Sequence, residues 1–214
     1  MASEPAREHS INMVVVAPLQ ATNPVQALDA AVYEVFECML GLGCVAQHAS
    51  PQEISSIAAV DSGRSIHWKH PVSAILGFAG KLSGSCTMSA EPAAVALIAK
   101  HLLSPTLPRA YPSEPDVQVH NATVADSLVF DPLQLNDTML DSFGEICNMI
   151  AGGWKNRIPG LDSGCALSVP TIISGSDYVL HPVGDRLLVE RIYHFKGHKM
   201  LLVIRCEEAG SHLF

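Results

Sequence analysis

Apolar residues recur every three or four positions in three stretches of the chain, which is the spacing of an amphipathic helix. The stretches cover residues 23–40, 91–103 and 136–156. Gly41 and Gly43 end the first helix, because glycine readily adopts the left-handed conformation that follows many helices. The second helix carries Pro92 in its first turn, where proline is tolerated, so we expect it to start near Ser89 or Ala90. The expected core positions of the first helix are Leu28, Val32, Val35, Phe36 and Met39.

Shorter apolar runs between and after these helices are typical of strands. The runs are 11–19, 54–60, 70–80, 81–90, 165–174, 186–195 and 199–207. Two pairs of runs are joined by short glycine-containing links, at residues 79–81 and 196–198, which favour hairpins and hence antiparallel pairing. A helix followed by three strands occurs twice. We therefore predict an α+β fold in which two pseudo-symmetric helix-plus-three-strand halves share one mainly antiparallel sheet, with the helices packed on it.

Residues 104–135 interrupt this repeated order. Four prolines fall within the stretch S-P-T-L-P-R-A-Y-P-S-E-P-D-V, which excludes a helix and disfavours a central strand. Because the elements after this segment complete the pattern begun before it, we interpret it as a proline-rich insertion in a single domain over residues 11–214. Residues 1–10 are polar and acidic, and we expect them to form a disordered tail.

Composition narrows the class of protein. Hydrophobic residues make up 48% of the chain and charged residues 16%, a balance that suits a packed core. The formal net charge of −8 argues against a nucleic-acid partner. No apolar run approaches the ~20 residues of a membrane span, and the acidic start does not resemble a secretion signal. We therefore expect a cytoplasmic protein that does not act at a membrane.

The spacing of the cysteines and histidines matches no common metal-binding or redox motif. The six cysteines lie in apolar surroundings without a C-x-x-C pair, so we interpret them as reduced core residues without disulfides. The ten histidines show no H-x-x-x-H or H-x-x-E-H grouping. A zinc site made by His101, His120 and His181 remains open as a weaker alternative, which would make the protein a zinc-dependent hydrolase.

The helix over residues 136–156 has two different faces. Its apolar face is formed by Met139, Phe143, Ile146, Cys147, Ile150 and Trp154. On the opposite side, Asp141, Glu145, Asn148 and Gly152 are spaced by four, three and four residues and fall within about 60° of one another. We expect the helix to begin at Asn136 or Asp137, with Thr138 and Asp141 as a capping pair.

A polar face of this kind is, in most helices, only the solvated side. Nevertheless, a carboxylate and an amide one turn apart can perform defined chemistry. An amide both donates and accepts hydrogen bonds, so it can orient a water molecule, and a carboxylate can pair with a cation of a partner. Phosphoryl transfer depends mainly on such positioning and charge neutralisation.

The stretch E-I-C-N-M-I-A-G-G resembles the signature of the CheC/CheX/FliY family of chemotaxis phosphatases. That signature is an acidic residue or serine, three residues, Glu, two residues, Asn, and a proline some twenty-two residues later. Asp141, Glu145 and Asn148 fill the first three places, and Pro170 follows after twenty-one residues. The stretches A-V-Y-E-V-F-E-C-M-L-G-L and V-S-A-I-L-G-F-A-G-K-L-S-G-S-C-T-M-S resemble the CheX branch, so the likeness extends over residues 24–103 and 136–207.

This resemblance implies a CheC/CheX-like fold and hydrolysis of the phospho-aspartate on a CheY-type response regulator. Asn148 would position the attacking water, and Glu145 would pair with the regulator's lysine. Asp141, Gly152 and Pro170 would support docking of the partner. The Mg²⁺ ion would be held by the regulator, so this chain would bind no cofactor and no metal. The resemblance also implies a homodimer formed by exchange of edge strands, for which residues 187–206 are the candidate segment.

The first-half helix carries Glu34 and Glu37 at the same spacing as Glu145 and Asn148 but has no asparagine, so we predict a single site. Two features depart from the family pattern and would affect docking of the partner. One is Gly153, where relatives often have asparagine, followed by the bulky Trp154; the other is the length of the insertion. The alternative to a phosphatase is a non-catalytic docking module that binds a signalling or flagellar-switch protein through the same face.

Overall fold

The structure is a computed structural model that describes residues 23–47, 58–60, 66–68, 72–104, 135–175, 178–180, 184 and 186–207. The tail over 1–10, the strand expected at 11–19 and nearly all of the proline-rich insertion lie outside the described residues. The same applies to His120 and His181.

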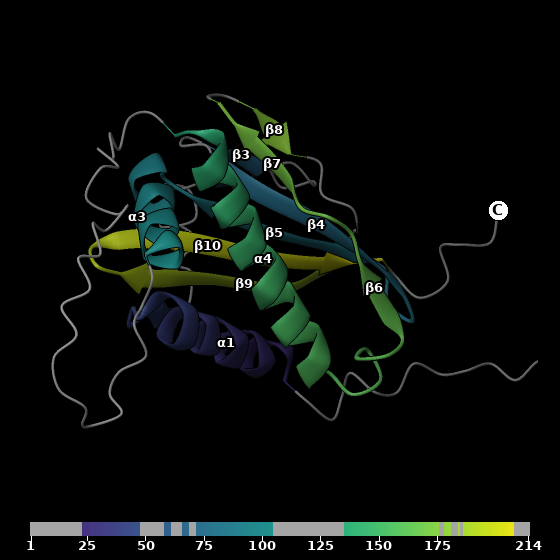
Figure 1. The fold of residues 1–214 in the computed structure, drawn as a ribbon. Coiled ribbons are helices and arrows are strands. Elements are labelled where there is room, and N and C mark those ends of the chain that lie inside the picture. Colours follow the sequence, from purple (N-terminus) through teal and green to yellow (C-terminus); the bar gives the residue numbers. More distant parts are fainter. Residues whose placement is uncertain are drawn as a thin grey trace, which may run out of the picture.

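A seven-stranded antiparallel sheet forms the centre of the molecule (Figure 1). Its order is β1-β9-β10-β5-β4-β6, and β7 also pairs with β4, beyond the end of β6. The strands are β1 (Val45–Gln47), β4 (Val72–Gly80), β5 (Gly84–Ala90), β6 (Cys165–Leu167), β7 (Thr171–Ser174), β9 (Arg186–Phe195) and β10 (His198–Cys206). At the centre, β5 pairs with β10 in a register that places Met88 opposite Leu202.

The strand order confirms the two pseudo-symmetric halves. The β4–β5 hairpin of the first half and the β9–β10 hairpin of the second lie side by side. Each half then contributes an edge strand to the other, since β1 pairs with β9 while β6 and β7 pair with β4. The α+β fold class predicted from the sequence is therefore correct. The two halves are joined by the central β5–β10 pair and also by the exchanged edge strands.

Two details of the strand prediction are wrong. The described part of the run at 54–60 is β2 (Ala58–Val60), which joins β3 (Ile66–Trp68) and β8 (Val179–Leu180) in a separate three-stranded sheet. The third main-sheet strand of the first half is instead β1, which no apolar pattern marks. Val45 is 67% exposed and only Ala46 packs against the core, so this three-residue edge strand is too short for periodicity to detect.

The segment over 187–206 forms most of β9 and β10. Strand β10 is paired on both sides, with β5 and with β9, whereas β1 pairs with β9 only at residues 192–194. Among the described strands, the outer positions of the main sheet therefore belong to β1 and residues 186–191 of β9 on one side and to β6 and β7 on the other. Exchange of this segment between two copies stays a prediction.

Three α-helices cover one face of the main sheet: α1 (Pro24–Val35), α3 (Pro92–Leu103) and α4 (Asp137–Arg157) (Figure 1). The Asn136 side chain caps α4 by accepting a hydrogen bond from the Met139 N–H at 3.0 Å. The expected capping role of Thr138 is wrong, because Thr138 lies inside the first turn and its carbonyl accepts a bond from Ser142. Helix α3 begins after Glu91 with Pro92 at its first position, because Ser89 and Ala90 complete β5.

Helix α1 continues directly into a π-helical turn, η2 (Phe36–Leu40), which ends at Gly41 with a left-handed φ of 62°. A π turn contains more residues than an α turn, so it rotates every later side chain around the helix axis. Leu40 therefore enters the core at 1% exposure, while Met39 is 41% exposed. The prediction that Met39 is a core residue is wrong for this reason.

Four of the six cysteines lie in the core and two do not. Cys86, Cys147, Cys165 and Cys206 are buried, as predicted, and none of the six forms a disulfide. Cys38, however, is exposed in η2. Cys44 is partly buried, and burial is the main reason that the pKa of its thiol rises to about 12.

A polar cluster joins α1 to β9 at the edge of the core. The guanidinium of Arg191, a residue only 8% exposed, donates to both carboxylate oxygens of Asp29, at 3.1 and 2.6 Å. The Tyr193 hydroxyl donates to the same carboxylate at 2.8 Å. Burial, and then the neighbouring Asp29 carboxylate, raise the pKa of Tyr193, so the hydroxyl remains a donor at physiological pH.

Asp29→Asn should lower the free energy of unfolding by about 3 kcal/mol, because it keeps the shape of the side chain but leaves the buried guanidinium without its counter-charge. Urea unfolding followed by circular dichroism measures the change. The exposed Asp162→Asn variant is the control and should stay within about 0.5 kcal/mol of the wild type. An effect of Asp29→Asn no larger than that of the control would contradict this role.

Candidate functional site on helix α4

Helix α4 is held against the sheet by its apolar face. All six predicted stripe residues are buried: Met139, Phe143, Ile146, Cys147, Ile150 and Trp154. The indole of Trp154 packs on Phe78 of β4 with ring centres 5.7 Å apart, and its N–H donates to the Pro24 carbonyl at 3.2 Å. Trp154 therefore faces the core and does not belong to the projecting face of α4.

The opposite face of α4 brings four predicted site residues into one stripe. Asp141 and Glu145 are exposed, and Asn148 and Gly152 are partly exposed. The spacing of four, three and four residues places them on successive turns. Within the described part of the chain, no hydrogen bond or ion pair engages the side chains of Asp141, Glu145 or Asn148. These side chains are therefore available to an external group.

Pro170 lies beside this stripe. A Cβ atom at Gly144 of α4 would be 3.6 Å from the Pro170 Cβ and 3.2 Å from the Ile172 Cδ1. Gly144 thus lets the chain between β6 and β7 approach α4 closely, one residue before Glu145. The fifth predicted residue therefore lies on the flank of the same surface, although it comes from a different element.

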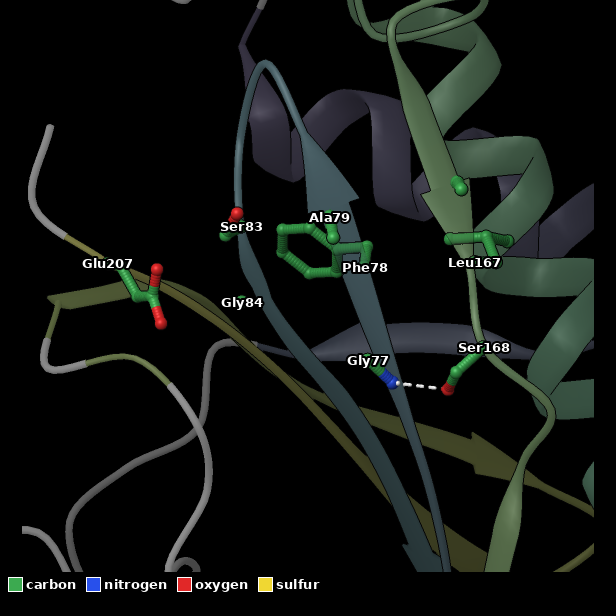
Figure 2. Close-up of a pocket in the computed structure, with 9 residues that line it drawn as sticks. Gly77, Phe78, Ala79, Ser83, Gly84, Leu167, Ser168 and Glu207 are labelled. Atoms are coloured by element: carbon green, nitrogen blue, oxygen red, sulfur yellow. Dashed lines mark hydrogen bonds between the residues drawn. The ribbon is translucent and has the colours of Figure 1, made fainter. Parts of the chain in front are cut away.

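Ser168 fixes the connection between β6 and β7 to β4. Its Oγ accepts a hydrogen bond from the Gly77 N–H at 2.8 Å, as Figure 2 shows, and its own N–H donates to the Gly77 carbonyl at 2.8 Å. These two bonds bridge the gap between β6 and β7 where neither strand pairs with β4. The next residue, Val169, is 85% exposed, so the bridge holds an apolar side chain in solvent beside Pro170. No sequence pattern marks Ser168, because its partner Gly77 is 91 residues away.

The pocket in Figure 2 lies behind this connection and has a volume of about 440 Å³. Small and apolar residues near the β4–β5 turn and β6 line most of it, and Glu207 closes one side. None of the five predicted site residues lines this pocket. Four of those five residues lie instead on the projecting face of α4, and Pro170 lies beside it.

On its other flank, α4 packs against α1 at very short range. A Cβ atom at Gly153 would be 3.1 Å from the Ala31 Cβ, and the Arg157 guanidinium donates to the Gly153 carbonyl at 2.8 Å. The same guanidinium forms an ion pair with Glu34 of α1. Gly153 is therefore explained by helix packing, which the sequence pattern did not reveal.

The ion pair between Arg157 and Glu34 also bears on the prediction of a single Glu–Asn site. Glu34 is the first-half residue whose position resembles that of Glu145, and its carboxylate is engaged by Arg157. Glu37 is exposed on η2, where the π turn has already changed the helical spacing. The arrangement of Glu145 and Asn148 is thus not reproduced by Glu34 and Glu37.

The described residues contain no cluster of histidine, cysteine, aspartate or glutamate suited to a metal ion. Of the three histidines considered for zinc, only His101 is described, and its Nδ1 donates to the Leu40 carbonyl at 2.8 Å. None of the described helices is long and apolar enough to cross a membrane.

A helix with a buried stripe and a projecting carboxylate–amide pair, on a sheet of two exchanged halves, defines the class of fold seen in CheC- and CheX-like proteins. The sequence pattern of the family described as "Chemotaxis phosphatase CheX" matches residues 72–190, more than half of the chain. The protein belongs to this family. Among curated proteins, no sequence matches the chain.

Solved structures share the fold at low sequence identity. The CheX protein of Desulfovibrio desulfuricans superposes with a TM-score of 0.59 at 15% identity, covering 87% of this chain and 100% of that one. The CheX protein of Vibrio vulnificus superposes with a TM-score of 0.57 at 17% identity, covering 87% of this chain and 97% of that one. The CheX protein of Borrelia burgdorferi was solved in complex with CheY, BeF3 and Mg²⁺. It superposes with a TM-score of 0.50 at 16% identity, covering 86% of this chain and 97% of that one.

The two adjacent glycines of α4 should respond oppositely to alanine. At Gly152 a new Cβ would meet only the Leu167 Cδ1, at 3.9 Å, so Gly152→Ala should stabilise the protein by about 1 kcal/mol through helix propensity. At Gly153 the contact with Ala31 would force the helices apart, and Gly153→Ala should destabilise by about 1 kcal/mol. Urea unfolding of both variants measures the difference, and equal stabilisation by both would contradict the packing described for α1 and α4.

Proposed function

We propose that this protein hydrolyses the phospho-aspartate of a CheY-type response regulator, using the projecting face of α4. The observation that carries the proposal is the pair formed by Glu145 and Asn148, which lie on successive turns and make no bond to another described residue. Membership of the CheX family supports the reaction type. The complex of the Borrelia burgdorferi relative with CheY supports the class of partner.

In the proposed mechanism, the α4 face enters the active site of the regulator. The Asn148 amide accepts a hydrogen bond from a water molecule and donates one toward the phosphoryl group, so that the water is held for in-line attack. The Glu145 carboxylate pairs with the regulator's lysine and fixes the relative position of the two proteins. Mg²⁺ belongs to the regulator in this proposal and neutralises phosphoryl charge there; this chain contributes no ligand to it.

The surroundings of the pair suit close approach by another protein. Gly152 has no packing reason to lack a side chain, because the nearest atom to an added Cβ is 3.9 Å away. A small residue one turn beyond Asn148 leaves room for the partner's backbone. On the flank, Pro170 and the exposed Val169 add a rigid apolar edge, and Asp141 extends the acidic charge that favours a lysine-bearing partner.

The reaction locates the protein in the cytoplasm, where response regulators act. A homodimer formed through sheet edges is also part of the proposal. It would use the candidate segment over 187–206, whose first residues in β9 lie at an outer position of the main sheet beyond β1 among the described strands.

Asn148→Ala should lower kcat about 100-fold with little change in regulator binding, because it removes the group that orients the water and leaves the docking residues in place. The measurement is phosphate release from a panel of phosphorylated CheY-type regulators of the same genome. Lys100→Ala, at an exposed position on α3, is the control and should retain the wild-type rate.

Two results would separate the alternatives. Equal rates for wild type and Asn148→Ala on an accelerated regulator would remove Asn148 from the mechanism. Binding of a regulator without any acceleration of its dephosphorylation would instead identify the protein as a non-catalytic docking module.

Glu145→Ala should act differently from Asn148→Ala, because the carboxylate is assigned to the partner's lysine. We expect KM for the phosphorylated regulator to rise about tenfold or more and the effect to shrink at high salt, since the pair is open to solvent before docking. Steady-state kinetics at low and high ionic strength test this. A loss confined to kcat and insensitive to salt would contradict the assignment.

A further inference from the structure

A second feature adjoins the proposed catalytic face. A groove of about 250 Å³ runs between α1 with η2 on one side and α4 on the other. Its apolar lining includes Val35, Met39 and Met149, and its polar lining consists of Glu34, Asn156 and Arg157. Its two charged residues, Glu34 and Arg157, pair with each other. The groove therefore has an apolar part, and a polar part in which the two charges neutralise each other.

The π turn creates one wall of this groove. If α1 continued as an α-helix, the periodicity of its buried residues would place Met39 in the core. The extra residue of η2 brings Leu40 into the core and leaves Met39 at 41% exposure beside the groove. Methionine side chains are flexible and polarisable, which suits surfaces that receive a partner's apolar group.

The groove begins at the residue that follows Asn148 in α4. Met149 directly follows Asn148, and Asn156 lies one turn beyond Gly152 on the same helix. The stripe from Asp141 to Gly152 is about 16 Å long and 10 Å wide, or roughly 160 Å². A stable interface buries about 800 Å² per partner and a weak signalling contact somewhat less. A protein that docks on this stripe must therefore also cover its flanks.

We propose that the groove between η2 and α4 is a docking site for an apolar side chain of the same response regulator, with Met39 and Met149 as its contact residues. The inference rests on the proposed function, and it deepens it by assigning regulator affinity to residues outside the family signature. Catalysis stays with Asn148, and Met39 and Met149 act on binding.

The test compares Met39→Gln and Met149→Gln with wild type. Glutamine has nearly the length and helix propensity of methionine but does not favour an apolar contact. Binding is measured to CheY-type receiver domains of the same genome, loaded with BeF3⁻ and Mg²⁺ and immobilised one by one. Each variant should weaken Kd about tenfold, equivalent to about 1.4 kcal/mol, with kcat at saturating regulator within about twofold of wild type.

Two further variants serve as controls. Met149→Leu restores an apolar side chain and should bind as wild type does. Leu187→Gln alters a side chain of similar exposure, 45% in β9, that does not line the groove, and should leave Kd unchanged.

Methyl resonances of the unmodified protein provide a readout that does not depend on any variant folding. In protein labelled at the methionine methyl carbons, the Met39 and Met149 signals should shift when the loaded regulator is added. The buried Met88 and Met200, both 0% exposed, should not.

The possible outcomes distinguish failure of the groove inference from failure of the proposed function. Unchanged Kd for both glutamine variants, with a regulator that the wild type binds and dephosphorylates, overturns the groove inference and leaves the proposed function intact. Weakened binding by both variants without any hydrolysis by the wild type supports the groove and overturns the phosphatase. Absence of binding to every loaded regulator overturns both.

Discussion

Close backbone approach on both flanks of α4 is the constraint on which the proposed site depends. Gly153 allows α1 to pack with Ala31 against the helix, and Gly144 allows Pro170 and Ile172 to pack on the other side. The buried stripe sets the rotation of α4 about its own axis, and these two contacts fix its position between its neighbours. Because both glycines act within the fold, the exposed stripe between them can present Glu145 and Asn148 without contributing to the core.

The elements around α4 come from both halves of the chain. Helix α1 belongs to the first half, and the β6–β7 connection is attached to β4 of the first half through Ser168 and Gly77. The exchange of edge strands therefore does more than close the sheet. It places a first-half helix on one flank of α4 and a strand connection on the other, so a partner that docks on α4 meets residues far apart in the sequence.

The π turn shows how a small backbone irregularity changes a surface. The side chains of α1 follow the predicted apolar spacing up to Phe36, and all four expected core residues to that point are buried. The π turn then rotates the following side chains, so that Leu40 and not Met39 occupies the core position. Periodicity cannot detect this change, because both residues are apolar and the choice between them depends on which one fits the core after Gly41 ends the helix.

The sequence by itself determined the three helices, the two hairpins and the residues of the candidate site. The spacing of apolar residues located the helices and hairpins, since a residue's burial follows from the face it occupies, and the spacing of Glu145 and Asn148 put them on the outer face of α4. Only the tertiary structure decided what surrounds that pair. The exchanged edge strands, the Ser168 bridge, the ion pair of Arg157 with Glu34 and the groove beside Met149 all join segments distant in the chain. Such contacts depend on how elements pack together, and no local periodicity encodes them.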